Sequence, residues 1–132
     1  MSNTRLRLIK NSEAGLLQKI AISTYKEAFD EFNTEENMKA YLSSCLSHQK
    51  LQSELENPNS EFYFAEWADQ VIGYLKLNFK DAQNEFKTDD SLEVERIYVL
   101  EKFHGQKVGQ TMFDYALKRA KEKDVNYVWL GV

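Results

Sequence analysis

At 132 residues, 42% hydrophobic and 29% charged, the chain has the size and composition of one soluble globular domain. Its net charge of −4 argues against a protein that tracks nucleic-acid phosphates, and no apolar segment is long enough to cross a bilayer. The single cysteine allows no internal disulfide, so we expect a reducing, cytoplasmic location. The one cysteine and two histidines form no metal-ligand cluster.

Helical periodicity dominates the first half of the chain after one short strand. The predicted elements are a strand over 4–9, a helix over 11–29, and helical segments over 33–46 and 48–56. Asn11 or Ser12 is the expected cap of the first helix, and Asn33 is the expected cap of the second. An Asn-Pro-Asn sequence ends the last segment.

The middle of the chain predicts an antiparallel hairpin. Residues 61–67 and 71–79 are rich in β-branched and aromatic side chains, and a three-residue connection separates them. The loop over 80–90 that follows is polar and carries charges of both signs. A third strand of this sheet is predicted to begin at residue 91.

That third strand, over 91–99, has an interrupted alternation. The apolar residues Leu92 and Val94 are out of phase with Ile97 and Val99. A slip of one residue indicates a β-bulge near 95–96, which would bend the strand and open a gap beside it. A strand buried on both faces would also lack a fixed phase, so both interpretations stay open.

A short turn joins this strand to a helix predicted over 108–123. The turn region contains Gly105 and Gly109. A strand that enters a helix through such a turn is a phosphate-binding arrangement, because free N–H groups and the helix dipole point to one place. Glycines in a turn also serve backbone geometry alone, so this pattern does not decide between the two interpretations.

A last strand is predicted over 127–132. The strand-helix-strand crossover implies one parallel pair in an otherwise antiparallel sheet. The predicted fold class is therefore α/β with a mixed sheet, in the order β-α-α-β-β-β-α-β when the helical segments of 33–56 are counted together. A strand as apolar as this last one should be covered on both faces.

Residues 91–132 resemble the GNAT family of N-acetyltransferases. The family signature is Gln or Arg, two residues, Gly, one residue, then Gly or Ala, and it falls on residues 104–109. Only Gly109 matches strictly, since His104 and Lys107 replace the usual residues. The flanking sequences LEVERIYVLEKF and VNYVWLGV are similar to bacterial members, especially the PaiA-like polyamine acetyltransferases.

The resemblance implies a single GNAT domain, 1–132, truncated after the fifth strand. Residues 1–90 would supply the acceptor-side helices and the hairpin, and residues 91–132 the part that binds acetyl-CoA. In the family a further helix, with a tyrosine that protonates the leaving thiolate, and two more strands follow. We therefore expect weak or no activity from this chain alone. We also expect a homodimer, and we expect the open edge of the last strand to be covered either by another chain or by a further segment of the same protein.

The resemblance also implies acetyl-CoA as the co-substrate, with no metal. The backbone of Ile97, Tyr98 and Val99 would bond the pantetheine arm along the bulged strand. The pyrophosphate would contact the amides of His104, Gly105, Gln106, Lys107, Val108, Gly109 and Gln110.

Acetyl transfer to an amine also needs a base, because an alkylammonium titrates near pH ~10 and is scarcely nucleophilic at neutral pH. Glu93 and Glu95 are the candidate catalytic residues, and in some family members a glutamate at the position of Glu93 has this role. Either carboxylate could instead be a sheet-surface group paired with Arg96 or a lysine. The candidate substrate-binding residues, which core packing would also explain, are Phe29, Phe32 and Tyr98.

The function implied is transfer of an acetyl group from acetyl-CoA to a primary amine by direct attack in a ternary complex. The acceptor would be a polyamine, another small amine or a protein amine, and neither nucleic acid nor a membrane is expected as a partner. Two alternatives stay open: a catalytically weak or inactive module that binds CoA, and a structural α/β interaction domain.

Overall fold

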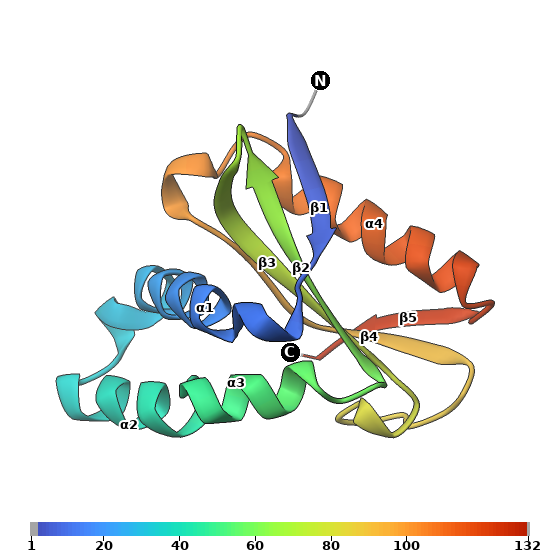
Figure 1. Ribbon diagram of the computed structural model, residues 1–132, viewed down its shortest axis with the longest axis horizontal. Coiled ribbons are helices and arrows are strands. Elements are labelled where there is room, and N and C mark those ends of the chain that lie inside the picture. The colour runs from blue at the N-terminus through green and yellow to red at the C-terminus, as the bar shows by residue number, and fades with distance from the viewer. Residues whose placement is uncertain (1–2, 132) are drawn as a thin grey trace.

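The computed structural model describes residues 3–131 and contains one mixed sheet with helices on both faces (Figure 1). The strands are β1 (Thr4–Leu8), β2 (Ser60–Trp67), β3 (Gln70–Phe79), β4 (Ser91–Val99) and β5 (Tyr127–Leu130). The helices are α1 (Ala14–Phe29), α2 (Glu35–Cys45), α3 (His48–Leu55) and α4 (Val108–Glu122). Helices α2 and α3 are thus separate elements, where the sequence order counted one.

The order of strands in the sheet is β1-β2-β3-β4-β5. Every neighbouring pair is antiparallel except β4 and β5, which run parallel because α4 carries the chain across the sheet between them. The predicted α/β class and its single parallel pair are confirmed. The predicted hairpin is confirmed as well: Ala68 and Asp69 both have positive φ, at 49° and 67°, as a tight turn between twisted strands requires.

Each face of the sheet has its own apolar core, beneath the helices that Figure 1 shows on that face. Helix α4 covers one face with the stripe that sequence periodicity predicts, namely Val108, Met112, Ala116 and Ala120, all buried. Helices α1 and α3 cover the other face, where Leu17 and Leu51 are fully buried near Phe64. Burial of each large apolar side chain is worth roughly 1.5–3 kcal/mol, so these two layers fix the sheet between the helices.

The bulge in β4 is present. Lys76 of β3 pairs with Arg96, but its neighbour Leu77 pairs with Val94, so Glu95 is the extra residue. Strand β5 pairs with β4 only over Ser91–Val94. Beyond the bulge, the described residues provide no strand on the β5 side of β4, and that half of the strand has an open edge.

The predicted helix caps were wrong. Thr34, and not Asn33, caps α2: its hydroxyl accepts the N–H of Asn37 at 3.0 Å, while Asn33 Nδ2 donates to the carbonyl of Phe29 at 3.0 Å. Neither Asn11 nor Ser12 caps α1, because a short 3-10 turn, Asn11–Glu13, precedes that helix and makes no side-chain cap. Asn33 and Thr34 are both good caps by residue type, and the side chain of Asn33 is already bonded to the carbonyl of Phe29, which leaves the cap to Thr34.

The last strand is less covered than its composition predicts. Tyr127 is 65% exposed and Leu130 is 51% exposed. Strand β5 forms the end of the sheet, so among the described residues it has a neighbour on one side only. Its apolar composition therefore leaves an exposed apolar edge in this chain.

Candidate active site

The open half of β4 presents backbone groups of alternate residues. The N–H of Leu100 donates to a β3 carbonyl at 2.8 Å, and Tyr98 has the same orientation two residues earlier. The carbonyl of Tyr98 lies so close to Gly73 of β3 that a side chain at Gly73 would collide with it. Ile97 and Val99 therefore direct their N–H and C=O groups toward the open edge, whereas Tyr98 directs its own to β3.

The turn after β4 leads directly into α4. A 3-10 turn, Glu101–Phe103, is followed by Gly105 and Lys107 with φ of 83° and 63°. The first helical hydrogen bond runs from Thr111 N–H to the carbonyl of Lys107 at 3.1 Å. The N–H groups of the first three α4 residues, 108–110, thus have no partner within the helix, and the positive end of its dipole lies at the turn.

Two grooves flank the open edge, one on each face of the sheet. The groove on the α4 side has a volume of about 530 Å³ and is lined by Ile97, Val99, Phe103, His104, Gly105, Lys107, Val108 and Gly109. The groove on the α1 side, of about 350 Å³, is lined by Thr24, Glu27, Ala28, Ile97, Tyr98, Val99, Glu101 and His104. All the predicted coenzyme-binding residues except Gln106 and Gln110 line one groove or the other.

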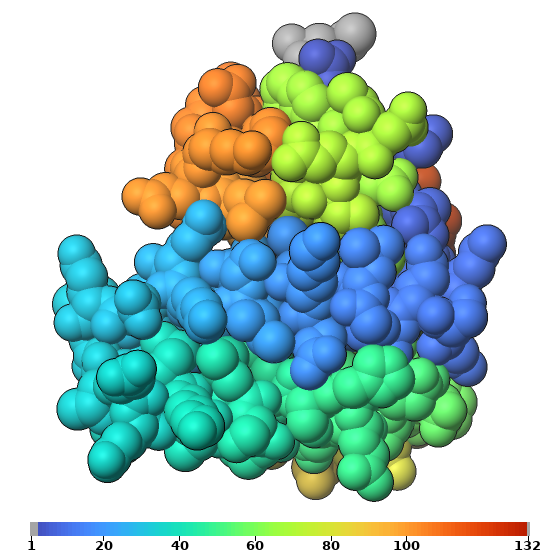
Figure 2. All heavy atoms as spheres, turned by 60° about the vertical axis from the view of Figure 1, so that its left-hand side comes forward, coloured from blue at the N-terminus to red at the C-terminus, as the bar shows by residue number. Residues whose placement is uncertain are grey.

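Two side-chain contacts hold the turn beside this edge. His104 Nε2 lies 2.8 Å from the carbonyl oxygen of Val99, and a carboxylate oxygen of Glu27 on α1 accepts the N–H of Glu101 at 2.7 Å. Figure 2 shows the turn, in orange, standing next to the blue α1 helix. No sequence pattern indicated the contact of Glu27, because the two residues are far apart in the chain.

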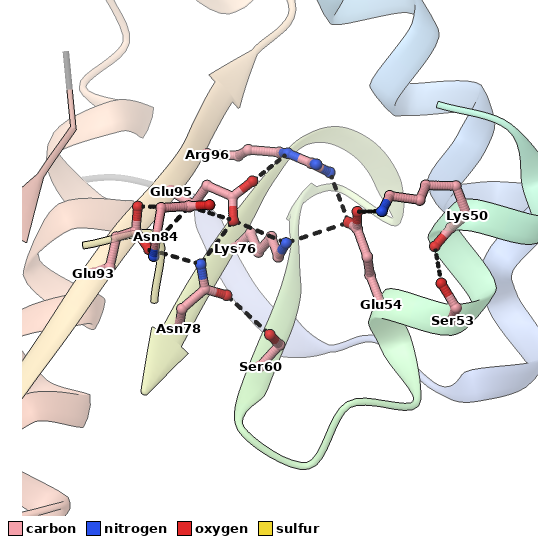
Figure 3. Close-up of polar contacts among 10 residues, drawn as sticks. All are labelled: Lys50, Ser53, Glu54, Ser60, Lys76, Asn78, Asn84, Glu93, Glu95 and Arg96. Atoms are coloured by element: carbon pink, nitrogen blue, oxygen red, sulfur yellow. Dashed lines mark hydrogen bonds and ion pairs between the residues drawn. The ribbon is translucent and has the colours of Figure 1, made fainter. Parts of the chain in front are cut away.

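Glu93 is a buried carboxylate held by amides (Figure 3). The residue is 3% exposed, and its carboxylate accepts hydrogen bonds from Asn78 Nδ2 at 3.0 Å, Asn84 N–H at 2.9 Å and Asn84 Nδ2 at 3.0 Å. Asn84 comes from the polar loop between β3 and β4, so that loop closes over Glu93. The donors that hold the Glu93 carboxylate are therefore uncharged, whereas the donors to Glu95 include two cations.

Glu95 is paired with cations in the same cluster (Figure 3). Its oxygens lie 2.9 Å from Lys76 Nζ and 3.3 Å from Arg96 Nε. Burial raises the pKa of this carboxyl, but the charge of Lys76 and hydrogen bonds from Lys76 and Asn78 outweigh burial, so its pKa is below the ordinary value. Glu95 is therefore a weaker proton acceptor than an unpaired glutamate.

The aromatic residues predicted for the acceptor lie along α1 and β4. Phe29 packs against Tyr25 with ring centroids 4.7 Å apart, and Tyr98 packs against Tyr74 at 5.8 Å. Phe32, at the end of a short turn after α1, is 77% exposed. The structure thus places Tyr98 at the open edge and Phe29 in an aromatic cluster of α1, and it does not bring Phe32 to them.

The family model described as acetyltransferase (GNAT) family matches residues 22–132. The chain belongs to the GNAT family. A Lactobacillus delbrueckii subsp. lactis protein described as an uncharacterised N-acetyltransferase in the pepI 3′ region is 37% identical over 131 residues, covering 98% of this chain and 76% of that protein. The chain is accordingly a GNAT-type, acyl-CoA-dependent N-acetyltransferase.

Solved structures show the same fold. The PaiA N-acetyltransferase of Thermoplasma acidophilum, in complex with coenzyme A, superposes with a TM-score of 0.82 at 22% identity, covering 100% of this chain and 80% of that one. An aminoglycoside acetyltransferase from an uncultured soil metagenomic sample, in complex with sisomicin, gives 0.73 at 13% identity, with coverages of 98% and 78%.

Residues 3–131 contain neither a metal-ligand cluster nor a membrane-spanning helix. No group of three or more histidine, cysteine, aspartate or glutamate side chains there could hold a metal ion. None of the described helices is both long and apolar enough to cross a membrane.

Replacement of Lys76 by methionine is expected to destabilise this GNAT domain by about 2 kcal/mol, because it removes one of the two cations, Lys76 and Arg96, that contact both Glu54 and Glu95. The pKa of Glu95 should rise at the same time. Because that pKa is depressed in the folded protein, its stabilisation is present at neutral pH and is lost as the pH falls through the folded value. Urea unfolding at neutral pH and near pH ~4 measures both effects.

Lys50→Met provides the matched control for Lys76→Met. Lys50 contacts the same Glu54 at 4.0 Å, but its side chain is 54% exposed. A solvated pair of this kind contributes at most about 1 kcal/mol. Equal losses in the two variants would show that burial of the Lys76 cluster has no special energetic weight.

Lys107 has a left-handed backbone conformation where the GNAT signature has glycine. A side chain in this conformation costs roughly 1–2 kcal/mol, part of which glycine returns as entropy of the unfolded chain. We expect Lys107→Gly to be more stable than Lys107→Ala by about 1 kcal/mol, since both remove the charge and only one removes the strain. Thermal unfolding of the two variants measures the difference, and equal stability would mean that the turn is unstrained.

Proposed function

We propose that this GNAT domain transfers the acetyl group of acetyl-CoA to a primary amine by direct attack in a ternary complex. The observation that carries the proposal is the open edge of β4, which begins at the Glu95 bulge and ends at the N-terminus of α4. An extended, amide-containing ligand arm can pair with such an edge as a further strand would. The helix terminus supplies the anion site for a pyrophosphate at the end of that arm.

Each end of the proposed coenzyme site has a distinct role. Ile97 and Val99 would bond the pantetheine amides, and the N–H groups of Val108 and Gly109 would bond the pyrophosphate, next to the charge of Lys107. Gly105 and Gly109 leave room there, since a Cβ atom at either would meet nothing within 4 Å. The residues present therefore fit the coenzyme in both shape and charge.

Glu93 is the proposed general base. In the transfer, the amine nitrogen forms a bond to the thioester carbonyl carbon, the carbon–sulfur bond breaks, and the coenzyme leaves as its thiolate. Glu93 would accept the proton that the nitrogen loses, directly or through one water. Asn78 and Asn84 hold its carboxylate in place, and a backbone N–H of β4 beyond the bulge would polarise the thioester carbonyl.

The acceptor class is proposed as a cationic amine, such as a polyamine, another small amine or a protein amine. Support comes from the carboxylate of Glu93, whose hydrogen-bond donors are neutral amides, whereas Glu54 and Glu95 are already paired with Lys76 and Arg96. The net charge of the chain, −4, also suits a cationic substrate. An assay of free thiol released from acetyl-CoA against a panel of polyamines, aminoglycosides and peptide amines tests the proposal.

The panel separates the alternatives. Thiol release that depends on an amine supports the transferase. Binding of CoA without turnover supports a CoA-binding module, which the unusual His104 and Lys107 in the signature also favour. Absence of both would leave a structural domain.

The homodimer is a separate proposal. Its support is the exposed apolar edge of β5, with Tyr127 and Leu130 more than half exposed. Light scattering measures the mass in solution, and a monomer at all concentrations would contradict it. The cytoplasmic location stays a prediction.

A further inference from the structure

The ring of His104 occupies a hydrogen-bonding position on the proposed coenzyme edge. Its Nε2 lies 2.8 Å from the carbonyl oxygen of Val99, so this nitrogen carries the hydrogen, since a carbonyl only accepts. Val99 is the last residue of β4, and its carbonyl points away from β3. The edge that an extended ligand would join is therefore already bonded at its end by a side chain of the same protein.

The ring also takes up space at that position. His104 lines the groove on the α4 side and the groove on the α1 side, and both of these also include Ile97 and Val99. A ligand arm paired with Ile97 and Val99 must pass between the two grooves. The ring and the arm thus compete for one carbonyl and for the volume beside it.

The turn that carries His104 is anchored independently of the ring. The carboxylate of Glu27 accepts the N–H of Glu101, and the N–H of His104 itself donates to the carbonyl of Glu101 at 3.0 Å. Rotation of the His104 side chain therefore leaves the backbone of the turn in place. The ring can leave the Val99 carbonyl without loss of the amides at the start of α4.

We propose that the His104 side chain occupies the Val99 carbonyl in the free enzyme and is displaced by the pantetheine arm when acetyl-CoA binds. The inference rests on the proposed function, because it requires the coenzyme arm to pair with β4. When the arm binds, the hydrogen bond between the His104 ring and the Val99 carbonyl must break, and this loss offsets part of the binding free energy of the arm. His104 thus lowers the affinity for the arm and leaves the affinity for the phosphates unchanged.

The test compares two ligands by calorimetry: CoA, which has the arm, and adenosine 3′,5′-bisphosphate, which has phosphates and adenine but no arm. His104→Ala removes the ring, and His104→Phe keeps a ring but removes the donor. A hydrogen bond exchanged in water is worth roughly 2- to 12-fold in an equilibrium constant. We expect CoA to bind tighter by about that factor to His104→Ala, less so to His104→Phe, and the bisphosphate to bind both variants as it binds the parent.

Each outcome decides between distinct roles. Weaker binding of both ligands would show that His104 serves the phosphates or the fold of the turn, and unchanged binding of CoA would show that the ring does not compete; either result overturns the inference. His48→Ala, which alters the other histidine of the chain, on α3, is the control for histidine replacement as such. A parent protein that binds no CoA would contradict the proposed function itself.

A second measurement needs no variant. Nitrogen NMR of the imidazole reports which ring nitrogen carries the hydrogen. The Nε2–H form of His104 should be dominant in the free protein, and its signal should shift when CoA is added but not when the bisphosphate is added. A signal that responds equally to both ligands would overturn the displacement of the ring by the arm.

Discussion

Replacement of Gly109 by valine is expected to abolish measurable binding of CoA while the protein stays folded. Gly109 is the second residue of α4 and lines the groove on the α4 side of β4. A Cβ atom there would meet no protein atom within 4 Å, so the free protein has room for the branched side chain. That room is the space where the pyrophosphate would approach the helix N–H groups. Calorimetry with CoA measures the loss.

Gly15→Val is the matched control for this variant. Gly15 is the second residue of α1, and a Cβ atom there would also meet nothing within 4 Å. Valine is no worse than glycine within a helix, so both variants should unfold at about the temperature of the parent. If Gly109→Val binds CoA as tightly as Gly15→Val does, the phosphate site lies elsewhere.

The second large effect concerns the base. Glu93→Gln is expected to lower kcat about 10²- to 10⁴-fold with an efficient amine, because a positioned general base typically contributes that much. Affinity for CoA should change little, since Glu93 lies on the part of β4 that pairs with β5. The acidic limb of the pH–rate profile should also move. Steady-state kinetics over pH, with CoA affinity measured in parallel, separates rate from binding.

Glu95→Gln is the comparison for Glu93→Gln. Glu95 contacts Lys76 and Arg96, so its loss should lower stability and leave kcat within about tenfold of the parent. A larger loss of rate in Glu95→Gln than in Glu93→Gln would reverse the assignment. Unchanged turnover and pH profile in both variants would remove these two glutamates from the mechanism.

Sequence patterns predicted those features of the fold that depend on local periodicity. The stripe of α4 is visible at a spacing of four residues, and the bulge appears as a change of phase between Val94 and Ile97. The cap of α2 was misplaced by one residue because Asn33 and Thr34 are both good caps. The side chain of Asn33 bonds instead to the carbonyl of Phe29, four residues earlier, and residue type alone does not rank the two candidates.

The candidate site was only partly predictable, because some of its side chains come from segments that are distant in the sequence. Residues 97–109 lie close together in sequence, so one strand, turn and helix bring most of them to the same grooves. The surroundings of Glu93 come instead from β3 and the following loop, through Asn78 and Asn84. Sequence alone could not separate Glu93 from Glu95, because their difference lies in these neighbours and in Lys76.

The order of strands in the sheet bears on how the molecule folds. Strands β2, β3 and β4 are neighbours in both sequence and space, so they form a meander, with a tight turn between β2 and β3 and the loop over 80–90 between β3 and β4. Local pairings of this kind close first, because little chain entropy is lost. Strand β5 can add only after α4 has crossed the sheet, and it then covers Ser91–Val94 alone. The edge that extends from the bulge is therefore the part of β4 that folding leaves unpaired.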